Sequence, residues 1–280
     1  MNLTQPAVSR RLQNFEASLG STPLLDRSAK PPVLTPLGRR VLEGCRRVLA
    51  SIEELRATAS PGAPRGEMRI GVAHGLADLA LSGPLDELRR RYSQVQLKIS
   101  ADWTVRLVEE LRSGALDCAI ALVDDVTRLP AAVASVPLGS EELVVVAGKP
   151  FSLPNSARGR LKRIAGSPWI LNPRGCGYRA AVQRAFDQLG LALDIGAEVF
   201  GHDLQLSLVA RGAGLTIVPR NKLETSPHRR ALKIIRLHEL ETATTIALLR
   251  GGPLGSLTEL VDLLGERVAE RLRKGALRNE

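Results

Sequence analysis

The sequence predicts an α/β fold for most of the chain, preceded by a helical N-terminal segment. Three observations lead to this prediction. From residue 67 onward, short apolar runs alternate with amphipathic stretches, which is typical of strands alternating with helices. Residues 118–123 are apolar throughout, as expected for a strand buried inside a parallel sheet. Before residue 60, the apolar residues follow only the helical period.

A first helix is predicted over residues 5–19. One apolar stripe with spacings of four, three and four residues is formed by Val8, Leu12, Phe15 and Leu19. Thr4 can cap this helix, Pro6 fits its first turn, and Gly20 can end it. The opposite face carries donors suited to phosphates and to base edges in a major groove, namely Gln5, Ser9, Arg10, Gln13 and Asn14. An ordinary amphipathic surface helix would show the same spacing.

A second, longer helix is predicted from Pro36 to about residue 59. Its apolar residues recur alternately every four and three positions, the heptad spacing of a coiled coil, at Val41, Cys45, Val48, Ile52, Leu55 and Ala59. Leu42 and Leu49 widen this stripe. A helix packed against its own domain would show a similar stripe, so the spacing leaves both arrangements open.

The remaining elements follow from the alternation of apolar runs. Residues 60–66, rich in Pro and Gly, are predicted as a hinge. Strands are expected at residues 68–72, 95–99, 118–123, 143–147, 169–171, 195–200, 215–218 and 244–249. Helices are expected at residues 75–92, 104–113, 178–189, 203–210 and 256–273.

Composition narrows the class of function. A chain of 280 residues with 44% hydrophobic residues can form two or three compact units. The net charge of +10 favours an anionic partner. Residues 1–65 hold ten Lys and Arg against five Asp and Glu, which is half of that excess. Aromatic residues make up only 3%, so contacts to duplex phosphates fit better than a stacking platform for single strands.

The cysteines and the absence of other motifs exclude several classes. Cys45, Cys118 and Cys176 are too few and too scattered for a disulfide framework or a zinc site. A thiol at a helix start has a lowered pKa, so Cys176 could sense oxidants, although no second cysteine lies nearby in the sequence. Because no signal peptide and no membrane-spanning run is recognised, a cytoplasmic location without membrane contact is expected.

No enzyme motif is recognised either. The sequence has no nucleophile elbow, no phosphate-binding glycine loop with a Lys, no zinc ligand set and no convincing pair of acids. We therefore expect a protein that is not an enzyme and that uses no cofactor and no metal.

Five short stretches carry a resemblance to a known family. Residues 5–10 read Gln-Pro-Ala-Val-Ser-Arg, residues 24–27 Leu-Leu-Asp-Arg and residues 34–38 Leu-Thr-Pro-Leu-Gly. Residues 114–120 read Gly-Ala-Leu-Asp-Cys-Ala-Ile, and residues 212–219 Gly-Ala-Gly-Leu-Thr-Ile-Val-Pro. With these stretches the chain resembles the LysR-type transcriptional regulators over its whole length. The resemblance implies that residues 5–19 are a recognition helix, that a wing follows it, and that residues 36–59 are the linker helix that pairs two subunits.

The resemblance also implies a domain organisation. Residues 1–59 are expected to form a partial winged helix-turn-helix DNA-binding domain with its linker helix, and residues 67–280 an effector-binding domain like the periplasmic binding proteins. Its two subdomains are expected at residues 67–146 with 244–280 and at residues 147–243, joined by two crossing strands. In the family, a further helix and most of a second one precede residue 1, so we expect an N-terminally truncated motif whose apolar stripe is exposed or repacked.

Candidate site residues come from the same resemblance. Thr4, Gln5, Pro6, Ser9 and Arg10 are expected to face the DNA groove, and Arg11, Arg27 and Lys30 to contact phosphates. Ligands in open α/β sheets bind at the carboxyl ends of strands, where helix N-termini suit a carboxylate. Three loops are expected there, and their candidate effector-binding residues are His74, Gly75, Leu76, Asn172, Arg174, Gly175, Cys176, His202 and Asp203. These loops could also be ordinary capped loops, and Arg179 is expected to brace its own loop.

The predicted function is that of a regulator. It would bind double-stranded promoter DNA as a homodimer or homotetramer and respond to a small, anionic effector that alters the recruitment of RNA polymerase. The alternative is a truncated small-molecule-binding protein, or a decoy, that lacks DNA binding.

Overall fold

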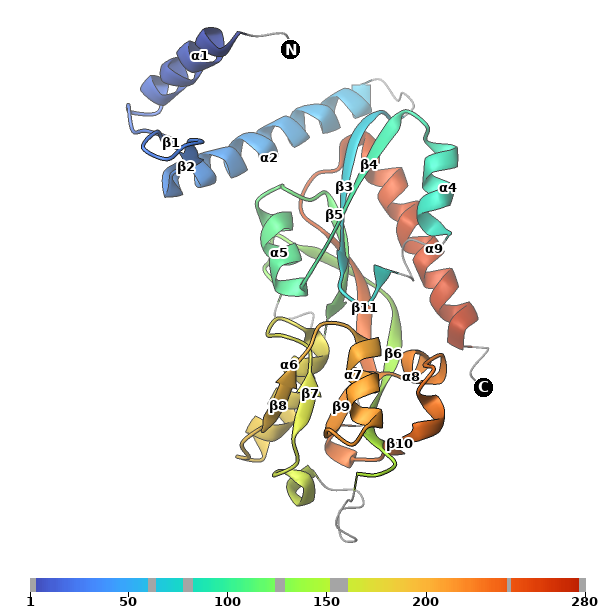
Figure 1. Cartoon of the computed structure of the whole chain (residues 1–280). Helices are drawn as coiled ribbons and strands as arrows, with labels where there is room; N and C mark the ends of the chain where they lie inside the picture. The colour runs from blue at the N-terminus through green and yellow to red at the C-terminus, as the bar shows by residue number, and fades with distance from the viewer. Residues whose placement is uncertain are drawn as a thin grey trace.

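The computed structural model describes residues 4–59, 64–77, 83–123, 129–151, 161–240 and 243–276. It consists of an N-terminal helical arm and an elongated α/β body (Figure 1). Most of the predicted hinge, residues 60–63, and the middle of the helix predicted over residues 75–92 lie outside the described residues.

The arm begins with α1 (Gln5–Ser18), which follows Thr4 in the N-cap position. The Thr4 side chain makes no capping hydrogen bond. Gly20 lies just after the helix with a φ of +93°, in the left-handed region where glycine is favoured, and the Ser21 N–H donates to the Glu16 carbonyl at 2.8 Å. The predicted helix and its glycine end are therefore confirmed.

A short hairpin connects α1 to the long helix α2 (Pro36–Ala59), and it is formed by β1 (Leu25–Asp26) and β2 (Val33–Leu34). The Thr35 hydroxyl donates to the Pro23 carbonyl at 3.0 Å and accepts the Gly38 N–H at 2.9 Å, which caps α2. A Cβ on Gly38 would lie 2.0 Å from the Leu24 carbonyl oxygen. The Leu-Thr-Pro-Leu-Gly stretch thus requires glycine at its last position because the hairpin backbone touches the helix there.

The described body contains one nine-stranded sheet, in the order β4-β3-β5-β11-β6-β9-β7-β8 with β10 paired to β6. Its strands are β3 (Gly66–Ala73), β4 (Val95–Asp102), β5 (Cys118–Val123), β6 (Ala134–Gly148), β7 (Trp169–Leu171), β8 (Ile195–Glu198), β9 (Leu215–Pro219), β10 (Leu232–Ile235) and β11 (Ala243–Arg250). β5 is buried along its whole length, as predicted. It is parallel to β3 but antiparallel to β11, so the sheet is mixed rather than purely parallel.

Two lobes share this sheet through the long strand β6 (Figure 1). The first half of β6, Ala134 to Glu142, pairs with β11, and the second half pairs with β9 and β10. We call the part built on β3, β4, β5 and β11 the first lobe, and the part built on β7, β8, β9 and β10 the second lobe. Only residues 143–147 of β6 were expected, because Pro137, Gly139 and two glutamates make its first half resemble a turn.

Helices cover both lobes. The first lobe carries α4 (Pro84–Arg91), α5 (Thr104–Arg112) and α9 (Thr258–Ala276), with α5 on one face of the sheet and α4 and α9 on the other (Figure 1). The second lobe carries α6 (Gly177–Gln188), α7 (His202–Ala210) and α8 (Arg220–Glu224). Short 3-10 turns are η2 (Leu161–Ile164), η3 (Arg229–Ala231), η4 (His238–Leu240) and η5 (Gly255–Leu257). The sequence did not predict α8 or β10.

Candidate functional site

Helix α1 presents its predicted DNA-facing side chains to solvent. None of its residues is buried, and Thr4, Gln5, Pro6, Ser9, Arg10 and Arg11 are all exposed. The apolar stripe is also accessible, with Val8, Phe15 and Leu19 each more than a third exposed. Among the candidate phosphate contacts, Arg27 has an ion-pair partner, because its guanidinium lies 3.7 Å from the Glu16 carboxylate, and Lys30 is exposed in the hairpin.

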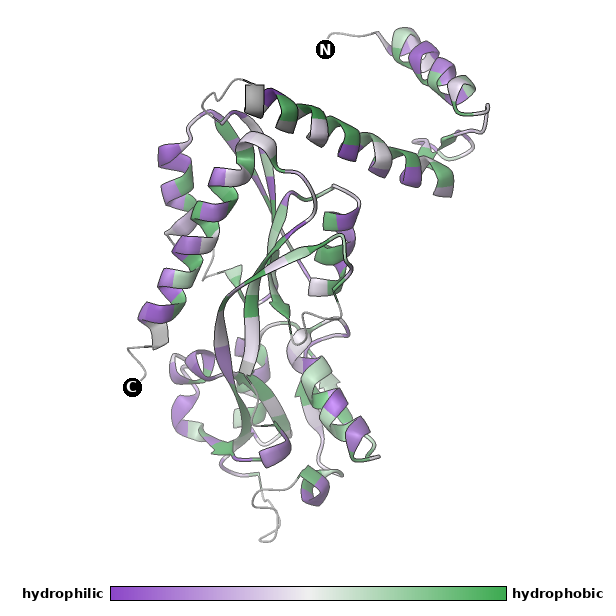
Figure 2. Ribbon diagram, turned by 180° about the vertical axis from the view of Figure 1, so that it is seen from behind, coloured by the Kyte–Doolittle hydropathy of each residue, from purple (hydrophilic) through white to green (hydrophobic). Residues whose placement is uncertain are grey.

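Helix α2 has two different sides. The later part of its heptad stripe is exposed, with Val48 at 60%, Ile52 at 39% and Leu55 at 71%. Figure 2 shows apolar residues recurring along this helix. No described residue covers the exposed part of the stripe, whereas Val41 and Cys45 are half-buried near its start.

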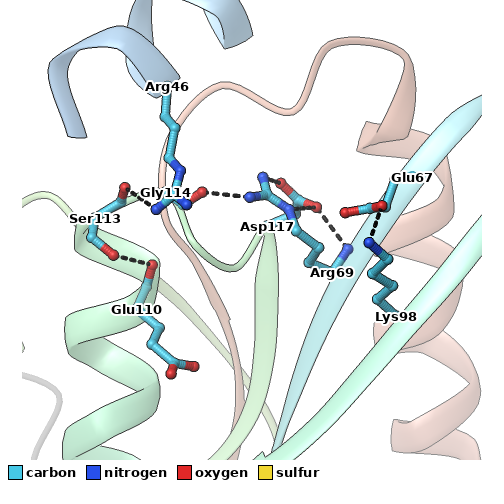
Figure 3. Close-up of polar contacts among 8 residues, drawn as sticks. All are labelled: Arg46, Glu67, Arg69, Lys98, Glu110, Ser113, Gly114 and Asp117. Atoms are coloured by element: carbon cyan, nitrogen blue, oxygen red, sulfur yellow. Dashed lines mark hydrogen bonds and ion pairs between the residues drawn. The ribbon is translucent and has the colours of Figure 1, made fainter. Parts of the chain in front are cut away.

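The other side of α2 touches the first lobe through Arg46 (Figure 3). Its guanidinium donates to the Ser113 carbonyl at 3.5 Å, and a Cβ on Gly114 would lie 3.1 Å from the Arg46 Cβ. Arg69 donates to the Gly114 carbonyl at 2.7 Å and also binds both carboxylate oxygens of Asp117. Two arginines thus hold the turn at the C-terminal end of α5, one from α2 and one from β3.

The opposite end of α5 lies at the boundary where the two lobes meet, and we call this boundary the crevice. α5 starts directly after Trp103, whose ring centroid lies 4.7 Å from that of His74 and 5.6 Å from that of Phe200. The centroids of His74 and Phe200 are 4.8 Å apart. His74 and Trp103 follow strands β3 and β4 of the first lobe, and Phe200 follows β8 of the second. These three rings, which we call the ring trio, therefore join the two lobes.

A second group of side chains lies beside the ring trio. The Tyr178 hydroxyl, at the start of α6, donates to the Glu141 carboxylate on β6 at 2.7 Å. Burial raises the pKa of Glu141. The ring of His202, at the start of α7, lies 5.6 Å from that of Tyr178, and burial lowers the pKa of His202.

The three predicted loops meet in this crevice. The Nδ1 of His202 shares a 3.1 Å hydrogen bond with Gln205, and its Nε2 would lie 3.4 Å from a Cβ on Gly75. A Cβ on Gly175 would lie 3.0 Å from the Cγ of Trp103. Loops that are far apart in the sequence are therefore in contact through these glycines.

The candidate effector residues differ in accessibility. Arg174, Gly175 and Asp203 are exposed. Leu76 is completely buried and its N–H donates to the Ala73 carbonyl at 3.0 Å, so neither its side chain nor its N–H is presented to a ligand. Asn172 is also buried and uses its side-chain carbonyl to accept the Gly201 N–H at 3.0 Å, which joins the second loop to the third.

Two further expectations concern the start of α6. Arg179 donates to the Asn172 carbonyl at 3.1 Å and to Glu198 at 2.6 Å, so it braces its own loop as expected. Cys176 is buried, and burial raises the pKa of its thiol despite nearby backbone N–H groups. The protonated thiol is a poor nucleophile, which argues against the oxidant-sensor interpretation.

The sequence predicted none of Trp103, Phe200 and Glu141 as crevice residues, and it placed Tyr178 there only as part of the second loop. Strand β4 was expected to end at residue 99 but continues to Asp102, which brings Trp103 to its carboxyl end. The scarcity of aromatic residues was a usable signal, because the chain holds only two Trp, two Tyr and four Phe.

A separate open cavity of about 400 Å³ lies where β10 leaves β6. Apolar side chains such as Leu143, Ile235 and Leu237 line it, together with Arg236 and Arg220. Arg220 is paired with both carboxylate oxygens of Glu142.

The described residues contain neither a membrane-spanning helix nor a cluster of metal ligands. No helix in the described ranges is long and apolar enough to cross a membrane. Within the same ranges, no group of three or more His, Cys, Asp or Glu side chains is placed to hold a metal ion.

Two known sequence families match the chain. The family described as LysR substrate binding domain matches residues 61–269, and the bacterial regulatory helix-turn-helix family of lysR type matches residues 1–39. The hydrogen peroxide-inducible genes activator of Pectobacterium carotovorum subsp. carotovorum is 25% identical over 272 residues, which span 95% of this chain and 89% of that protein.

Solved structures are similar in fold. Full-length OxyR from Pseudomonas aeruginosa superposes with a TM-score of 0.75 at 19% identity, covering 95% of this chain and 86% of the other. The effector binding domain of QuiR in complex with shikimate superposes with a TM-score of 0.59 at 17% identity, covering 75% of this chain and 99% of that domain.

Proposed function

The chain belongs to the LysR family of transcriptional regulators, which are DNA-binding proteins and not enzymes, and on that premise we propose how its parts act. It binds promoter DNA in the cytoplasm as a dimer or tetramer. A small anionic effector binds between the two lobes and changes how the regulator engages DNA and RNA polymerase. The observation that carries this proposal is the contact chain from the crevice through α5 to Arg46 of α2.

Exposure and charge support the assignment of α1 to the DNA groove. Gln5, Ser9 and Arg10 lie on its exposed face, and none of them has a partner among the described hydrogen bonds and ion pairs. Such side chains are free to meet base edges, while Arg11 and Lys30 are placed for phosphates. Arg27 is the weaker candidate, since it must leave Glu16 to contact DNA.

The stripe on α2 supports assembly through this helix. An exposed heptad stripe along a helix of 24 residues, about 36 Å long, is suited to pair with a second copy of itself. Pairing there would place two copies of α1 about a two-fold axis, as a pseudo-palindromic DNA site requires. Arg46 lies on the other side of α2, so this assembly leaves its contact with the first lobe intact.

The crevice supports an effector site. The helices α6 and α7 begin there, the positive end of a helix dipole favours an anion, and Arg174 lies exposed beside them. The similarity to the effector domain of QuiR, solved in complex with shikimate, supports a small-molecule ligand for this domain.

Two variants test the DNA-binding assignment. Arg10→Ala should weaken binding to the DNA upstream of the protein's own gene by ~1–3 kcal/mol with little effect on random DNA. Lys30→Ala should weaken binding to both DNAs equally and lower the dependence on salt. Mobility-shift titrations at several salt concentrations measure both effects. Equal losses on both DNAs for Arg10→Ala would contradict the assignment.

The same titration distinguishes the proposed regulatory function from the alternative of a protein that does not bind DNA. If the wild-type chain shifts neither DNA while its crevice binds a ligand, the protein acts as a small-molecule-binding protein or decoy. The exposed stripe on α1, which no described residue covers, is the feature of the structure that favours that outcome.

A further inference from the structure

We propose that the effector crevice is built for a planar aromatic ring, so that its ligand is an aromatic carboxylate rather than an aliphatic one. This inference rests on the proposed function, since it names the chemical class of the ligand for the same crevice. It is carried by the side chains that surround the crevice.

The first observation is the concentration of rings. The chain has only two Trp, two Tyr, four Phe and four His. Five of these rings come together here from four different connections between strands and helices, namely His74, Trp103, Tyr178, Phe200 and His202. In a chain so poor in aromatic residues, this concentration at one lobe boundary is the observation from which we infer a site for a ring.

The second observation is how the ring trio is arranged. His74 meets Trp103 at an interplanar angle of 71° and Phe200 at 81°, which are edge-to-face contacts. Phe200 contacts both other rings and is still 58% exposed, so its ring lies at the entrance with surface left for another ring. Edge-to-face and offset contacts between rings are favourable beyond the area that they bury.

The third observation is the pair of glycines beside the rings. Gly175 has a φ of +103° and Gly75 a φ of +93°, both in the region that disfavours other residues. At Gly175 a side chain would press on Trp103, and at Gly75 one would meet His202 and Tyr178. Both loops therefore bring bare backbone into contact with aromatic rings, and Phe200 is the ring of this group that stays most exposed.

The charges around the crevice set the orientation of the ligand. The Glu141 carboxylate lies against the Tyr178 hydroxyl, so a second carboxylate at that end would be repelled. Arg174 and the N-terminal turn of α6 lie at the exposed end. We therefore expect the ring of the ligand to lie against the exposed ring of Phe200, with its carboxylate pointing toward Arg174.

The test compares matched pairs of probes on the full chain by calorimetry. Benzoate and naphthoate are compared with cyclohexanecarboxylate and decalincarboxylate, which have the same charge and similar size without aromaticity. We expect each aromatic acid to bind about tenfold more tightly than its saturated counterpart, as two or three edge-to-face contacts would give. Benzylamine, an aromatic cation, should bind more weakly than benzoate.

Fluorescence reports where the probes bind. The chain has two tryptophans, and Trp169 is fully buried in the core, so a ligand in the crevice should quench only Trp103. The quenching should disappear in Trp103→Phe. Phe200→Leu should remove most of the preference for the aromatic acids, while Phe15→Leu on α1 and Arg236→Met at the other cavity should leave it unchanged.

Three results would overturn the inference. They are equal binding of aromatic and saturated acids, an undiminished preference in a folded Phe200→Leu variant, and no binding of any probe at millimolar concentration. DNA mobility shifts distinguish this failure from that of the proposed function. Selective aromatic binding without any DNA complex would contradict the regulatory role, whereas DNA binding without aromatic selectivity would contradict the ring site alone.

Discussion

At the scale of single residues, two glycines of α2 look alike in the sequence and differ completely in their surroundings. A Cβ on Gly38 would collide with the Leu24 carbonyl oxygen, whereas a Cβ on Gly44 would meet nothing within 4 Å. The first glycine joins the hairpin to the helix, and the second is an ordinary helical position.

Alanine at the two positions should therefore act in opposite directions. Gly38→Ala should force Leu24 away and destabilise the hairpin by about 1–3 kcal/mol. Gly44→Ala should stabilise the helix by up to about 1 kcal/mol. Hydrogen exchange of the Thr35 amide, which donates to the Leu24 carbonyl, measures the first effect. Unchanged protection in Gly38→Ala would show that the hairpin can shift without loss.

A second contrast at this scale concerns two Tyr–Glu hydrogen bonds of 2.7 Å. Tyr178 donates to the buried Glu141, whose pKa is raised by burial, and Tyr92 donates to Glu259, whose side chain is 62% exposed. Because the folded-state pKa of Glu141 is raised, its contribution to stability is complete at low pH and is lost as pH rises through that pKa. The hydrogen bond from Tyr178 lowers this pKa and limits the loss.

Tyr178→Phe should thus destabilise the protein more as the pH rises. We expect a loss of about 1–3 kcal/mol near neutral pH and above, and a smaller loss at acid pH, where Glu141 is protonated. Tyr92→Phe should show a small effect with little pH dependence, since Glu259 remains in water. Urea unfolding across the pH range gives both curves, and identical curves for the two variants would refute the role of Glu141.

At the scale of elements, helices and strands were predicted correctly where the signals for them lie close together in the sequence. Strand β5 was predicted because all six of its residues are apolar, and α1 because its stripe and end signals are adjacent in the sequence. The first half of β6 was missed because its strand character comes from β11, about a hundred residues away in the sequence, and Pro137 is accommodated by an irregular register there. Phe200 could not be placed from sequence, because its partners follow β3 and β4.

Helix α5 gives a prediction at this scale. It has nine residues, about 14 Å, between Trp103 in the crevice and Ser113 at Arg46. Arg46→Met keeps an alkyl chain against Gly114 but removes the donor to Ser113. We expect it to leave benzoate binding unchanged and to reduce the coupling between benzoate and DNA binding by about 0.5–2 kcal/mol.

The neighbouring Arg47→Met is the matched control, since Arg47 makes no hydrogen bond or ion pair among those of the described residues. Mobility shifts with and without benzoate measure the coupling for each variant. If Arg46→Met keeps the wild-type coupling, α5 does not transmit the signal through this contact.

At the scale of the whole molecule, we expect the exposed stripe of α2 to determine how many chains assemble. Val48→Asp would place a charge in the centre of the stripe and should convert the assembly to monomers. Analytical sedimentation measures this change in oligomeric state. The affinity for a two-fold symmetric DNA site should decrease together with the loss of assembly. Ser51→Asp puts the same charge beside the stripe and should have a smaller effect. Monomers in the wild type at micromolar concentration would rule out assembly through α2.

The sharing of β6 by both lobes has a mechanical consequence. Its partner changes from β11 to β9 between Glu142 and Leu143. The second lobe binds that point, because Tyr178 hydrogen-bonds to Glu141 and Arg220 pairs with Glu142. Because the strand is hydrogen-bonded to different partners on either side of that point, we expect the lobes to move by turning about it rather than by sliding past one another. A rotation of a few degrees about this point would displace the distant loop tips far more than the strand itself.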